Sequence, residues 1–71
     1  MNRPELTKNQ AEVLSFVKKY MKAKGYPPTR QEITTGFGWA SVNAAQQHLH
    51  LIEKKGYIRV DAGIQRGIVI L

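Results

Sequence analysis

The sequence predicts a mainly helical α+β domain, with three helices followed by a C-terminal two-stranded hairpin. Apolar residues recur at helical spacing before Gly56, and the period then changes to about two, which is typical of strands. Each of the three helical segments begins at a Ser or Thr that can act as its N-cap. A chain of 71 residues normally forms one domain, so we expect residues 1–71 to fold as a single unit.

The first helix is expected over about residues 7–24. Thr7 and Gln10 form a capping-box pattern, in which both side chains satisfy free backbone N–H groups of the first turn. Gly25 can adopt the left-handed conformation that ends a helix. The core-facing stripe of this helix consists of Val13, Leu14, Val17, Tyr20 and Met21.

The second helix is expected to be short, over about residues 29–35, after two prolines that cannot continue a helix. Thr29 and Glu32 repeat the capping-box pattern at its start. In the turn that follows, we expect Gly36 and Gly38 to supply positive φ values. The two aromatic residues of the same turn should point inward and anchor it.

The third helix is expected over about residues 41–55, with Ser41 as its N-cap and Gly56 as its C′ residue. Its apolar stripe consists of Val42, Ala45, Leu49 and Ile52. Its opposite face carries Asn43, Gln46, Gln47 and His50. This face has no acid before Glu53, so nothing on its first turns repels phosphate. Its amides both donate and accept hydrogen bonds, as the edge of a base requires.

The hairpin is expected over about residues 57–71, with strands at 57–60 and 68–71 and a glycine-containing turn between them. A bracing helix, a short helix, a glycine turn, a longer helix and a hairpin together describe a winged helix-turn-helix. In this fold the third helix enters the major groove of DNA with its N-terminal residues leading. The hairpin is the wing.

The net charge supports a nucleic-acid partner. The chain contains eleven Lys and Arg but only five Asp and Glu, which gives a formal charge of +6. The alternative is that a basic surface merely aids solubility. Four lysines lie within residues 18–24, where they suit the helix dipole and can also attract DNA in general. The absence of cysteine, of a long apolar run and of a signal-peptide pattern favours a cytoplasmic location.

Several blocks of the sequence match one known family in order and spacing. They are Leu6-Thr7 with Gln10, Glu12 and Val13; Pro27-Pro28-Thr29-Arg30 before Glu32-Ile33; Asn43-Ala44-Ala45 with His48-Leu49; Lys55-Gly56 with Ile58; and Gly63 with Arg66-Gly67-Ile68. In these blocks the chain resembles the N-terminal DNA-binding domain of the LexA repressors of the bacterial SOS response. The resemblance covers about residues 6–71.

The resemblance implies a sequence-specific repressor that binds a palindromic double-stranded operator as a homodimer. The sequence has no obvious dimer interface, so we expect that the free protein can be a monomer. The resemblance also implies base contacts at Ser41, Asn43 and Ala44. Gln46 and Gln47 stand where the family is typically acidic, and they too lie at the base edges. Glu and Asp accept from cytosine, whereas Gln pairs with adenine, so the operator should differ from the usual one.

Contacts to the DNA backbone or from the wing are expected from a second group of residues: Thr29, Arg30, His50, Lys54 and Arg66. Arg30 lies in the first turn of the helix that crosses the backbone. Arg66 lies near the tip of the wing, within reach of a phosphate or of the minor groove.

Other functional classes have little support. His48 and His50 are two apart on a helix and do not face each other, so we expect no metal site. Without a nucleophile–base pair we expect no enzyme, no cofactor and no small-molecule substrate. The chain stops before the self-cleaving domain of LexA, so it is either a fragment or a stand-alone protein of a mobile element or phage. The alternative function for such a protein is to bind another protein, either a host repressor or the transcription machinery.

Overall fold

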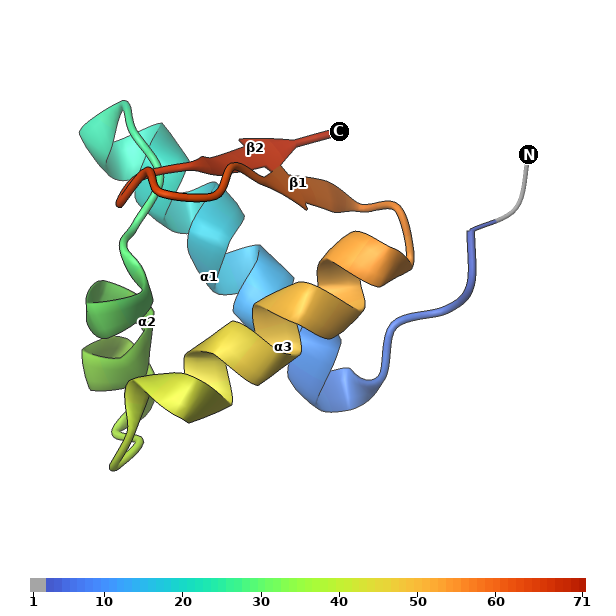
Figure 1. The fold of residues 1–71 in the computed structure, drawn as a ribbon, viewed down its shortest axis with the longest axis horizontal. Helices are drawn as coiled ribbons and strands as arrows, with labels where there is room; N and C mark the ends of the chain where they lie inside the picture. The colour runs from blue at the N-terminus through green and yellow to red at the C-terminus, as the bar shows by residue number, and fades with distance from the viewer. Residues whose placement is uncertain (1–2) are drawn as a thin grey trace.

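A computed structural model describes residues 3–71 and contains the three helices and the hairpin that the sequence predicts. The elements are α1 (Lys8–Lys24), α2 (Arg30–Phe37), α3 (Val42–Lys54), β1 (Ile58–Val60) and β2 (Ile68–Ile70). Figure 1 shows α3 crossing in front of α1, with α2 beside the first half of α3 and the hairpin above them. The α+β winged helix-turn-helix architecture is therefore confirmed.

Local capping explains where the helices begin. The Thr7 hydroxyl accepts from the Gln10 backbone N–H at 3.2 Å, and the Gln10 side chain accepts in return from the Thr7 N–H at 3.0 Å. Thr29 and Glu32 form the same reciprocal pair at the start of α2. Ser41 accepts from the Asn43 backbone N–H at 3.1 Å and starts α3.

The end of α2 differs from the prediction, because the helix continues through Gly36 and Phe37. Of the two glycines in this turn, Gly38 has a positive φ, of 70°, and Gly36 does not, so the expectation for Gly36 was wrong. A Cβ on Gly36 would lie 2.5 Å from Cε2 of the Phe16 ring. The glycine at this position therefore lets the Phe16 ring pack against the helix backbone rather than forming the turn.

The hydrophobic core lies between the three helices and the inner face of the hairpin. Its buried members are Val13, Leu14, Val17, Ile33, Ala45, Leu49, Ile52, Ile58 and Ile68. Val42 was expected in the apolar stripe of α3, but its side chain is 38% exposed. As the first residue of α3, Val42 precedes the first buried position of the helix, Ala45.

Aromatic rings anchor the turn between α2 and α3. The Phe37 and Trp39 rings stack with their centroids 4.7 Å apart, and His48 of α3 stacks on the other side of Trp39 at 4.9 Å. The His48 Nδ1 donates to the Ala44 carbonyl at 2.7 Å, which fixes the ring. These contacts confirm the expected inward direction of both aromatic residues and hold the start of α3 in place.

The C-terminal end of α3 is tied to the first turn of α1 and to the chain just before it. The Lys55 ammonium donates to the side chain of Gln10 at 2.7 Å and to the Glu5 carbonyl at 2.8 Å. The Tyr57 hydroxyl donates to the Pro4 carbonyl at 2.9 Å. Together with the capped N-terminus, these bonds fix α3 at both ends.

The hairpin is antiparallel, with Ile58 opposite Ile70 and Val60 opposite Ile68. Its turn is closed by the Asp61 N–H, which donates to the Gly67 carbonyl at 2.9 Å. Gly67 is buried at this point, and a Cβ there would lie 2.7 Å from the Asp61 carbonyl oxygen. Backbone atoms cannot move aside as a flexible side chain can, so the turn requires glycine.

We therefore expect Gly67→Ala to destabilise the domain by about 1–3 kcal/mol, the usual cost of inserting a methyl group into a filled space. Urea unfolding followed by circular dichroism measures this change. Gln65→Ala is the control, because Gln65 is exposed in the same turn. Equal stability of the two variants would show that the turn relaxes around the added methyl group.

Candidate nucleic-acid interface

The outward face of α3 borders a groove with a volume of about 430 Å³. Its lining residues are Arg30, Asn43, Gln46, Gln47, Leu49, His50, Glu53 and Val60. They come from α2, from three turns of α3 and from β1. The apolar stripe of α3 is packed on the core, so its amide side chains must face outward, and this brings the predicted base-contacting amides together in one place.

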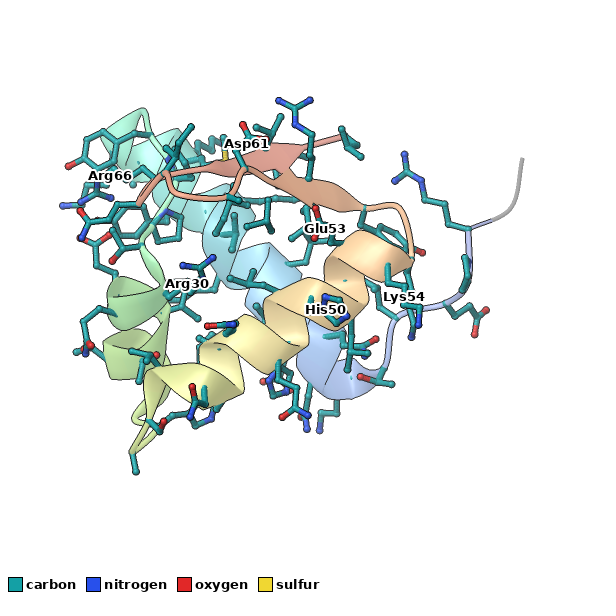
Figure 2. All side chains as sticks on the ribbon, in the orientation of Figure 1. Arg30, His50, Glu53, Lys54, Asp61 and Arg66 are labelled. Carbon is teal, nitrogen blue, oxygen red and sulfur yellow. The ribbon has the colours of Figure 1, made fainter. Side chains whose placement is uncertain are left out.

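Arg30 enters this groove from the first residue of α2, and Figure 2 shows its side chain between α2 and α3. It is half-buried, and among residues 3–71 its guanidinium has no ion pair and no hydrogen bond. An arginine offers five N–H donors in a planar fork. The groove thus combines amides that donate and accept with a cation whose donors are available.

Glu53 is a lining residue that the sequence interpretation missed. Its carboxylate accepts from the Val60 backbone N–H at 2.8 Å, so it joins the last turn of α3 to the outer edge of β1. Figure 2 shows its position between these two elements. A signal was present in the sequence, because Glu53 follows His50 by three residues and shares its helix face.

The remaining predicted residues lie outside the lining of the groove. Ser41 and Ala44 are at the start of α3, where Ser41 is exposed and Ala44 is half-buried. Lys54 is exposed at the other end of the helix. Thr29 forms the N-cap of α2, with its hydroxyl oxygen accepting a backbone N–H. Their contacts with DNA stay predictions.

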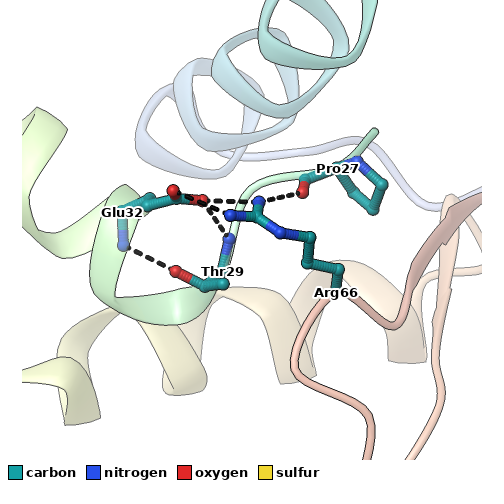
Figure 3. A network of polar contacts seen from close by, with 4 residues as sticks. All are labelled: Pro27, Thr29, Glu32 and Arg66. Carbon is teal, nitrogen blue, oxygen red and sulfur yellow. Dashed lines mark hydrogen bonds and ion pairs between the residues drawn. The ribbon is translucent and has the colours of Figure 1, made fainter. Parts of the chain in front are cut away.

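Arg66 lies apart from the groove and is held by partners within the domain (Figure 3). Its guanidinium donates to both carboxylate oxygens of Glu32, at 2.8 and 3.0 Å, and to the Pro27 carbonyl at 2.8 Å. It also lies over the Tyr26 ring, 4.4 Å from the centroid. In the free protein Arg66 therefore fastens the wing to the start of α2, and its expected contact with a phosphate or the minor groove stays a prediction.

The same bonds favour the charged form of Glu32. Hydrogen bonds from Arg66, and then the Thr29 backbone N–H, lower the pKa of Glu32 from 4.5 to about 2. The interaction with Glu32 in turn raises the pKa of Arg66. A carboxylate with a lowered pKa stabilises the fold above its unfolded pKa and loses this contribution as the pH falls through its folded pKa.

We therefore expect the fastening between the wing and α2 to weaken as the pH falls from about 4.5 to about 2. Thermal unfolding at pH 6, 4 and 3 measures the effect, and Glu32→Gln is the control because it removes the titrating group. The native protein should lose more stability than Glu32→Gln over this range. The same pH dependence in both proteins would contradict a stabilising role for the ionised pair.

Two kinds of feature are absent from residues 3–71. No group of three or more His, Cys, Asp or Glu side chains lies together there in a way that could hold a metal ion. No helix in this part of the chain has the length and hydropathy needed to cross a membrane.

Comparison with known proteins gives a consistent result. A family model described as the LexA DNA binding domain matches residues 3–67. The LexA repressor of Glaesserella parasuis is 46% identical over 71 residues, which are 100% of this chain and 34% of that protein. The LexA repressor of Pseudomonas chlororaphis is 47% identical over 66 residues, 93% of this chain and 33% of that protein. The chain thus spans about a third of the length of these relatives.

Proposed function

The chain belongs to the LexA DNA-binding domain family, and on this premise we propose that it is the DNA-reading part of a transcriptional repressor. In this proposal α3 lies in the major groove of an operator half-site, with its N-terminal turns against the bases. The observation that carries the proposal is the groove, which gathers three amide side chains and Arg30, an arginine without an ion pair in the described residues 3–71, on the outward side of α3.

The three amides have the chemistry that reads bases. Asn43, Gln46 and Gln47 are all exposed, and their side chains have no hydrogen bond to another part of residues 3–71. Asn and Gln pair bidentately with the N6 and N7 atoms of adenine. Ser41 and Ala44 flank these residues at the start of the helix, where the family resemblance implies further base contacts.

Gln46 and Gln47 set the expected difference from related operators. Acidic residues at these positions would accept from the N4 group of cytosine, whereas glutamine favours adenine. The proposed operator therefore carries adenine at the positions that Gln46 and Gln47 contact, and differs there from the usual LexA operator. We further propose that two copies bind the two halves of a palindrome and that the target genes belong to a damage response.

Selection of bound sequences from random duplexes tests this proposal. It should recover a preferred half-site in two symmetric copies, and the variant Gln46→Glu/Gln47→Glu should shift the preference from adenine towards cytosine. The variant changes only exposed side chains, so we expect its fold to be the same as that of the native protein. Recovery of unrelated sequences with both proteins would contradict base reading by α3.

The second proposed role, docking on a host repressor or on the transcription machinery, makes a different prediction about salt. DNA affinity must fall steeply as salt rises, because bound phosphates release counterions. Titration of a fluorescent duplex at 50 and 200 mM salt distinguishes the two roles. A domain that captures a protein partner but shows no salt-sensitive binding to DNA would support docking.

A further inference from the structure

The excess positive charge of this domain is not located in the groove. The lining of the groove contains one cation, Arg30, and one anion, Glu53, so it is close to neutral when His50 is uncharged. Helix α1 contains five lysines and one acid, Glu12, which gives it a charge of +4. Most of the formal +6 of the whole chain therefore belongs to a helix that contributes nothing to the groove.

The lysines of α1 lie largely on the side away from the core. Its buried residues, Gln10, Val13, Leu14 and Val17, define the side that packs inward. At 100° per residue, Lys8 and Lys19 point about 170° from the mean direction of these residues, and Lys22 about 130°. All three are exposed, and so is Glu12, which points about 150° from the same mean direction. We call Lys8, Lys19 and Lys22 the back face of α1; it extends about 21 Å along the helix.

The helix dipole does not explain the back face. Lysine is favourable in the last turn of a helix, which accounts for Lys22. Lys8 is the first residue of α1, at the positive end of the dipole, and the first turn contains no acid to compensate it. Among residues 3–71 none of the three lysines forms an ion pair. Glu12 lies one turn after Lys8 and offsets part of its charge, so the back face has a net charge of +2 and leaves Lys19 and Lys22 free for an external anion.

We propose that the back face of α1 binds the phosphate backbone of a second DNA duplex, so that one domain can bridge two DNA segments. Since α3 packs against the inner side of α1, the back face and the groove lie on opposite sides of the molecule. The domain measures at least 23 Å in every direction, so one straight duplex cannot reach both surfaces. The inference depends on the proposed function in one respect, because it assumes that the first duplex is bound at the groove.

A bridging assay tests the proposal directly. A random-sequence duplex of about 30 base pairs is immobilised, the protein is added, and capture of a second, fluorescent duplex is measured at 50 mM salt. Each lysine–phosphate contact contributes about 0.9 to the slope of log affinity against log salt. Lys19→Gln/Lys22→Gln should therefore reduce capture at least tenfold and lower the salt slope of capture by nearly 2.

The matched control is Arg3→Gln/Arg59→Gln, which removes the same charge from exposed residues outside both surfaces. It should reduce capture much less than the lysine variant, and both variants should still bind the immobilised duplex. If the native protein binds the first duplex and captures no second one, or if both variants lose capture equally, the back face is only a solvated surface. If the native protein binds no duplex at all, the proposed function fails as well, and the two failures are thus distinguishable.

Discussion

Replacing Asn43 with alanine should remove most of the preference of this domain for its operator over random DNA. The Asn43 side chain lines the groove and has no partner among the described residues, so it is free to pair with a base. A bidentate pair of this kind discriminates by about 1–3 kcal/mol. The preference should therefore fall by about 5- to 150-fold, while affinity for random duplex changes little.

Fluorescence anisotropy with the selected operator and with a random duplex, at one salt concentration, measures both affinities. Arg30→Ala is the companion variant. If Arg30 contacts phosphate, as its place at the start of α2 suggests, its loss weakens both complexes by the same factor. Equal loss on both duplexes for Asn43→Ala would remove Asn43 from the base contacts. A loss confined to the operator for Arg30→Ala would assign base reading to Arg30.

The largest effect on stability is expected from Ile33→Ala. Ile33 is fully buried in α2, within the core cluster formed by the three helices and the hairpin. Truncation of a buried isoleucine to alanine costs about 2–5 kcal/mol. A domain of this size has a total unfolding free energy of about 4–11 kcal/mol. The variant should therefore lose a large part of the stability of the domain, and its DNA binding should fall in proportion to the fraction that is unfolded.

Urea unfolding measures the cost, and Ile64→Ala is the matched control because it makes the same truncation at a side chain that is 55% exposed. The control should differ from the native protein by no more than about 0.5 kcal/mol. A loss below about 1 kcal/mol for Ile33→Ala, outside the range for buried truncations, would mean that the core collapses around the missing atoms.

Features set by neighbouring residues could be predicted from the sequence. The capping boxes at Thr7 and Thr29 involve residues three apart, and the helix-ending roles of Gly25 and Gly56 depend only on their own φ angles. The shared position of the groove-lining amides could be predicted for the same reason, because helical spacing places Asn43 and Gln47 on one face of the helix. Such features require no knowledge of how the elements pack.

Features that depend on packing could not be predicted. The contact of Arg66 with Glu32 is one of them, because the two residues are 34 apart and only the folded chain brings them together. Gly36 was assigned to a turn because nothing local reveals that the Phe16 ring fills the space where its side chain would be. The neutrality of the groove likewise depends on Glu53 and Arg30, from different helices, lining the same hollow.

The bond between Glu53 and the outer edge of β1 has a consequence for self-association. Exposed strand edges can pair with another chain, and repeated pairing at both edges of a sheet leads to fibres. In this hairpin the β1 edge lies against α3, and its Val60 N–H is already engaged. Backbone pairing can therefore extend the sheet only beyond β2. When two hairpins pair through their β2 strands, the outer edges of the joined sheet are the two β1 strands. These edges are already covered, so no third copy can be added.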